Sequence, residues 1–158
     1  MSQVIEFFDA AFRQIHKRSS ELLDILSQEE LYLRPKNTVA NLTPLSTGEF
    51  LLRSAAAVEQ FAGGITRRLW DDPFEWTLPE KLTSKELVRE YLNEVESLRQ
   101  QAFGFIKSDR ELHAKIPAPN DLRTIGEIII DAFARAAHYQ GRAFSAYQIL
   151  TGSKPPRI

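Results

Sequence analysis

Residues 124–156 read TIGEIIIDAFARAAHYQGRAFSAYQILTGSKPP, and this stretch carries the signals of one long helix from its start to its end. Thr124 is followed three residues later by Glu127, the capping-box pattern in which the hydroxyl accepts a hydrogen bond from a free backbone N–H and the carboxylate reaches back. Gly152 and the proline pair after it supply a stop. The pattern predicts a helix over 124–151.

The same start signal occurs twice more along the chain, at Ser46 with Glu49 and at Thr83 with Glu86. Each of these pairs opens a run whose apolar residues recur with helical spacing. A further apolar stripe near the N-terminus recurs at spacings of three, four and seven, and it consists of Phe8, Phe12, Ile15, Leu22 and Leu26. The sequence therefore predicts four helices, over 3–27, 46–69, 84–108 and 124–151.

The connections between these helices are long and contain prolines, and no stretch shows the alternation that a sheet requires. Connections of more than about ten residues are long for adjacent antiparallel helices. We therefore expect at least one loop to cross the end of the molecule, in place of a plain up-down-up-down order. The predicted fold is all-α: a single domain over 1–158 that forms a four-helix bundle with long connecting loops.

Composition excludes several classes of function. With a net charge of -1 the chain lacks the basic surface of a nucleic-acid-binding domain, and its apolar stretches are far too short to cross a membrane. The N-terminus has acidic residues where a signal peptide has basic ones, so we expect a cytoplasmic protein. The chain has no cysteine, which excludes disulfides and thiolate metal ligands.

Three segments together resemble the DinB/YfiT-like family. The run His138-Tyr139-Gln140-Gly141-Arg142, with the Gly and Pro-Pro tail after it, is similar to the end of that family's last helix. STGEFLLRSAA at 46–56 and ELYLRP at 30–35 resemble the family's second helix and the loop before it. The resemblance implies a four-helix bundle, a homodimer, and a divalent metal held by one histidine of the second helix and two, four residues apart, of the last.

In this chain the three positions that match those histidines hold Arg53, Arg135 and Tyr139. Arginine is always protonated and repels a divalent cation. His138 remains, but it matches a neighbouring position, and one residue along a helix turns a side chain by about 100 degrees. We therefore expect no metal and no other cofactor.

The two arginines leave two interpretations open. Glu49 lies one turn before Arg53, and Asp131 lies one turn before Arg135, which is the spacing of ordinary helical ion pairs. Alternatively, both arginines point to the former metal position, where they need carboxylates or a bound anion. The residues that bear on a ligand site are Arg53, Arg135, Tyr139, Glu49, Asp131 and His138.

Three functions are compatible with this pattern. The favoured one is a DinB-like protein that has lost its metal site and serves as a non-catalytic or small-ligand-binding accessory protein. The second is a metal-independent enzyme that binds a small anionic substrate through Arg53 and Arg135, with Tyr139 as proton donor. The third is a thiol-S-transferase-like metalloenzyme with relocated ligands.

Overall fold

The structure, a computed structural model, describes residues 3–36, 45–73 and 76–157. Most of the described chain is helical, as the all-α prediction requires, and the long helices begin and end within three residues of the predicted positions. The elements are α1 (Gln3–Ile25), α2 (Thr47–Arg67), α3 (Lys85–Phe105), α4 (Asp109–Leu112), β1 (Lys115–Pro117), β2 (Leu122–Thr124) and α5 (Ile125–Thr151). No helix in these ranges is long and apolar enough to cross a membrane.

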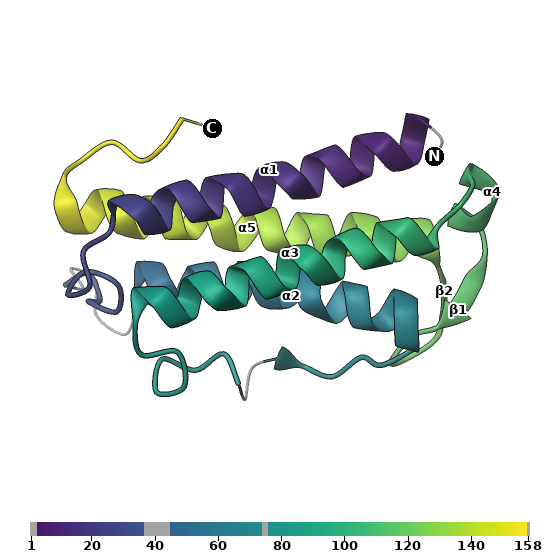
Figure 1. Cartoon of the computed structure of the whole chain (residues 1–158), viewed down its shortest axis with the longest axis horizontal. Helices are drawn as coiled ribbons and strands as arrows, with labels where there is room; N and C mark the ends of the chain where they lie inside the picture. Colours follow the sequence, from purple (N-terminus) through teal and green to yellow (C-terminus); the bar gives the residue numbers. More distant parts are fainter. Residues whose placement is uncertain (1–2, 37–44, 74–75, 158) are drawn as a thin grey trace.

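The four long helices pack side by side, with α1 and α2 at opposite corners (Figure 1). Helix α2 packs against α5 and α3, and α1 packs against the same two helices. The described parts of the segment between α2 and α3, 68–73 and 76–84, lead back along the length of the molecule, and these two neighbouring helices run in the same direction (Figure 1). The expected departure from up-down-up-down order is therefore present.

Two of the three predicted capping boxes form. Ser46 accepts a hydrogen bond from the backbone N–H of Glu49, and Thr124 accepts one from that of Glu127, with both reciprocal carboxylate bonds in place. The third prediction is wrong by one residue, because α3 is capped by Ser84, whose hydroxyl accepts from the N–H of Leu87. Adjacent hydroxyl residues at 83 and 84 make the local pattern ambiguous.

The structure also contains one small sheet that the sequence pattern did not predict. Between α3 and α5 the chain forms a small antiparallel pair in which Ile116 lies opposite Arg123. Each strand has three residues, too few for an alternating pattern to be visible in sequence. The last residue of β2, Thr124, is also the N-cap of α5. The hairpin therefore fixes the point at which α5 enters the helical core.

One phenylalanine from each long helix meets at the centre of the core. The ring of Phe12 in α1 lies 5.3 Å from Phe61 in α2, 5.5 Å from Phe103 in α3 and 5.5 Å from Phe133 in α5, between ring centroids. Phe12 is 1% exposed, and Ile129 of α5 is fully buried. The predicted apolar stripes therefore face the core.

The segment 30–35 packs over the start of α2. The N–H of Gly48 donates to the carbonyl of Leu31 at 2.8 Å. A Cβ at Gly48 would lie 2.6 Å from that oxygen, so the close approach requires glycine. Arg34 also donates hydrogen bonds to Glu49, so segment 30–35 is bound to the start of α2.

Candidate functional site

Helices α2 and α5 are joined along their contact by a buried hydrogen bond. The hydroxyl of Ser54 donates to the carbonyl of Ala136 at 2.8 Å, and both residues are fully buried. Small residues at this contact let the helices approach closely. Arg53 and Arg135 each lie one residue before this joint, so they reach the surface on the same side of the helix pair.

The structure brings three of the predicted site residues together. Arg53, Arg135 and Tyr139 line one pocket of about 140 Å³. The guanidinium carbon of Arg53 lies 6.0 Å from the ring centroid of Tyr139. The remaining walls come from α2 and from the segment that leads to α3, and they are Ala56, Ala57, Gln60, Asp72, Pro73 and Thr77. We call this pocket the arginine cleft.

The side chain of Arg135 is nearly half exposed to solvent. One terminal nitrogen donates to the side-chain oxygen of Gln60 at 2.9 Å, and Nε lies 3.8 Å from a carboxylate oxygen of Asp131. The same Asp131 oxygen lies 3.6 Å from Arg123. The predicted Asp131–Arg135 ion pair therefore exists, but its N–O distance is long and Asp131 is shared with a second arginine. The side chain of Arg135 is 45% exposed. Such pairs contribute little free energy.

Glu49 does not lie in the arginine cleft. Its carboxylate accepts two hydrogen bonds from Arg34, at 2.6 and 3.1 Å, and others from Ser46. Burial raises the pKa of Glu49, but the bonds from Arg34 and Ser46 outweigh that effect and leave the pKa lowered. The expectation that Glu49 serves Arg53 is corrected: Glu49 closes the capping box and anchors the preceding loop.

His138 also lies outside the lining of the cleft. Its side chain is exposed, and its ring packs in a T-shaped arrangement with that of Tyr139, at 5.5 Å between centroids. Over residues 3–36, 45–73 and 76–157, no three His, Cys, Asp or Glu side chains lie close enough together to hold a metal ion. The arginine cleft does not fit a divalent cation either, because two guanidiniums line it. The arrangement suits an anion.

Sequence reasoning missed the residues that complete the cleft. Gln60 links two walls, because its oxygen accepts from Arg135 while its nitrogen donates to the carbonyl of Trp70 at 3.2 Å. Trp70 is held by close packing on Gly64, where a Cβ would lie 2.3 Å from the indole ring. The indole N–H also donates to Pro117 at 2.9 Å. These long-range contacts fix the path of the chain after α2, and no local sequence pattern predicts them.

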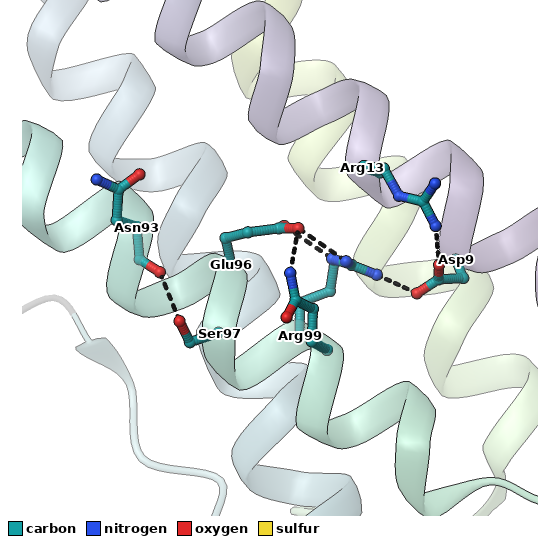
Figure 2. Close-up of polar contacts among 7 residues, drawn as sticks. Asp9, Arg13, Asn93, Glu96, Ser97 and Arg99 are labelled. Carbon is teal, nitrogen blue, oxygen red and sulfur yellow. Dashed lines mark hydrogen bonds and ion pairs between the residues drawn. The ribbon is translucent and has the colours of Figure 1, made fainter.

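A second polar group lies between α1 and α3, and the sequence interpretation missed it as well (Figure 2). Arg99 donates two hydrogen bonds of 2.8 Å to Glu96 and also binds Asp9 of α1. Asp9 accepts from Arg13 at 2.5 Å. Only 3% of the Arg99 side chain is exposed. We call these four residues the buried ion-pair cluster; Arg13 lies at its solvent edge, with 62% of its side chain exposed, and the two arginines and two carboxylates neutralise one another.

The buried ion-pair cluster borders a small cavity of about 20 Å³ that is partly open to solvent, and its polar lining includes His16, Ser19, Ser54, Glu96 and Arg99. That volume suits about one water molecule and no larger ligand. Burial lowers the pKa of His16, which favours the neutral imidazole there. The cavity and the cluster are therefore structural features of the core.

Comparisons with known proteins give a fold and no family. No family model matches the chain, and no curated protein matches it. Among solved structures, the crystal structure of a conserved protein from Enterococcus faecalis superposes with a TM-score of 0.73 at 16% sequence identity. The match covers 97% of this chain and all of the other. The chain thus shares its fold, over nearly its whole length, with that bacterial protein.

Proposed function

We propose that this chain is a non-catalytic protein that binds a small anionic molecule in the arginine cleft. We further propose that it is a DinB-like protein in which Arg53, Arg135 and Tyr139 stand at former metal-ligand positions. One observation supports anion binding above others: the three residues singled out in the sequence lie on two helices and line the same pocket. Homodimerisation stays a prediction from the resemblance.

The charge of the cleft favours an anion. Among the described residues that line it, two are arginines and one, Asp72, is acidic. A guanidinium fork can bind carboxylate, sulfate or phosphate through two parallel hydrogen bonds. Tyr139 adds a hydroxyl that can donate a third hydrogen bond.

The size and openness of the cleft limit the ligand. Pockets for drug-sized ligands hold about 300–1,000 Å³, whereas the cleft holds about 140 Å³. Arg135 is nearly half exposed, so a ligand reaches it without local unfolding. Arg135 and Gln60 also line a neighbouring pocket of about 240 Å³, which leaves room for a substituent on the anion. Inorganic phosphate, sulfate and short dicarboxylates fit these limits.

A thermal-shift comparison of three proteins tests the proposal. Wild type, the Arg53→Ala/Arg135→Ala variant and an Arg110→Ala/Arg157→Ala variant are titrated with phosphate, sulfate and malonate at constant ionic strength. The last variant removes the same charge from exposed arginines elsewhere. A ligand at 100 times its Kd stabilises the folded state by about 2.7 kcal/mol.

We expect at least one anion to raise the unfolding temperature of wild type and of the Arg110→Ala/Arg157→Ala control. The Arg53→Ala/Arg135→Ala variant should show only the general salt effect. Equal shifts in all three proteins, or no anion-specific shift in wild type, would contradict the proposal.

A further inference from the structure

The carboxylate of Glu59 in α2 accepts hydrogen bonds from two neutral donors on neighbouring parts of the chain. It accepts a hydrogen bond of 2.5 Å from the hydroxyl of Tyr91 in α3. It also accepts from the indole N–H of Trp76, at 3.2 and 3.3 Å to its two oxygens. Tyr91 is buried, so its hydroxyl is fixed in place. The carboxylate is therefore held in one orientation between α2, α3 and the segment that joins them.

The charge of Glu59 has no cationic partner within residues 3–36, 45–73 and 76–157, where no ion pair joins it to Lys, Arg or His. Burial raises its pKa, and the nearby Glu94 raises it further, against the opposing hydrogen bonds of Tyr91 and Trp76. Glu49 and Glu96 differ, because arginine partners lower their pKa. A partly buried carboxylate without a counter-charge is costly, and a bound cation would relieve that cost.

A pocket of about 190 Å³ opens beside this carboxylate. Asp71 adds a second acidic side chain, and Trp76 adds an indole ring. Apolar walls come from Leu69, Pro73 and Leu98, while Gly63 leaves one wall without a side chain. We propose that this pocket, the Glu59 pocket, binds a small organic cation through its primary ammonium group.

The chemistry of the lining favours an ammonium. An ionised carboxylate offers about four lone-pair directions, and Tyr91 and Trp76 occupy only part of them. An ammonium has three donors to share between Glu59 and Asp71, and an indole face attracts a cation within about 6 Å. The apolar walls suit a short alkyl chain. Arg67 and Asp71 both line the pocket as exposed side chains, so solvent and salt screen both charges, and the partly buried Glu59 is the main charge partner of the ammonium.

The Glu59 pocket is separate from the arginine cleft: of the lining residues that the structure describes, the two pockets share only Gln60 and Pro73. Ammonium binding is therefore independent of the anion proposal. The alternative is that Glu59 and Trp76 only fasten the segment between α2 and α3 to the helices. The experiment below separates these two roles.

The test follows the indole N–H resonance of Trp76 by NMR, identified by its loss in a Trp76→Phe variant. The probe is n-butylammonium chloride at constant ionic strength, with n-butanol as the neutral analogue. Glu59→Gln removes the charge but keeps an acceptor for Tyr91. Glu94→Gln is the matched control, because it removes a nearby charge that does not line the pocket.

We expect a saturable shift with butylammonium in wild type and in Glu94→Gln, and none with butanol. Glu59→Gln should raise the Kd about tenfold or more, the effect of losing a hydrogen bond to a charged group. If Glu59→Gln does not fold, Asp71→Asn decides, with an expected rise of about two- to fivefold. The proposal is overturned if wild type shows no saturable shift, if butanol binds equally well, or if the deciding variant binds like wild type.

Discussion

Arg99 and Arg135 share a local sequence pattern, since each follows an acidic residue by one helical turn, yet the fold gives them opposite surroundings. Arg99 is 3% exposed and makes two 2.8 Å hydrogen bonds to Glu96, with Asp9 as a further partner. Arg135 is 45% exposed and lies 3.8 Å from Asp131. Helical spacing brings an acid and a base together in both cases. Burial decides whether carboxylates occupy the hydrogen-bond donors of the arginine or leave some of them accessible to a ligand.

The largest expected effect on stability is at Arg99, the buried arginine of this comparison. Arg99→Ala leaves the largely buried Glu96 without its arginine partner and Asp9 with only the exposed Arg13, which costs about 3–5 kcal/mol in the free energy of unfolding. Urea denaturation measures this difference. A loss below about 1 kcal/mol would mean that the cluster is solvated and resembles the Arg135 pair.

The apolar core around the buried ion-pair cluster should be nearly as sensitive. Phe12 lines the same small cavity as Arg99, and Ile129 is fully buried in α5. Truncation of either side chain to alanine should cost about 2–5 kcal/mol by leaving a cavity. Phe7→Ala is the control, because Phe7 is 75% exposed and its loss should change stability by no more than about 0.5 kcal/mol. Equal effects at Phe7 and Phe12 would mean that the phase of α1 is wrong.

Acid should weaken the buried region in two steps. Burial lowers the pKa of His16, so the unfolded chain binds a proton more readily and stability falls as the pH drops below the ordinary value of 6.5. Burial raises the pKa of Glu96, but the hydrogen bonds from Arg99 and Gln100 outweigh it, and the net pKa is lowered. Its contribution is therefore complete above the ordinary value of 4.5 and is lost as the pH falls through the lowered value.

Unfolding free energies at pH 7.5, 5.5 and 4 measure both steps. His16→Gln should abolish most of the loss between pH 7.5 and 5.5, whereas Arg135→Ala should leave the whole profile unchanged. A profile that is flat from pH 7.5 to 5.5 in wild type would contradict the buried placement of His16.

The smallest effect is expected in the arginine cleft. Arg135→Ala should change the free energy of unfolding by less than about 1 kcal/mol, because exposed ion pairs contribute that much at most. The same urea titrations as for Arg99→Ala give the comparison directly. A loss of several kcal/mol would show that Arg135 has a structural role and would remove the contrast between the two arginines.

The helices could be predicted from sequence because their signals are local. Ser46 with Glu49 and Thr124 with Glu127 need only four consecutive residues to form a cap, and both boxes form. The strands around Ile116 could not be predicted, since three-residue strands carry no visible period. The direction of the helices could be predicted only in part. The length of the connections was enough to exclude a plain up-down-up-down order.

The site was predicted in part. Arg53, Arg135 and Tyr139 were found through positions on two helices, which the fold places on one pocket. Glu49 was misassigned because Arg34, distant in the loop, competes successfully for its carboxylate. Arg99 was missed although it continues the buried stripe of α3 formed by Val88, Leu92, Val95 and Ala102. A charged residue on such a stripe signals a buried ion pair.

The most direct test of the account follows the arginine Nε–H resonances by NMR during a titration with inorganic phosphate at constant ionic strength. Anion binding in the arginine cleft predicts saturable shifts at Arg53 and Arg135. The resonances of Arg99, which is buried and bound to carboxylates, and of Arg110, which is exposed outside the cleft, should not shift. Unchanged resonances at Arg53 and Arg135, or shifts of equal size and affinity at Arg110, would contradict the central claim.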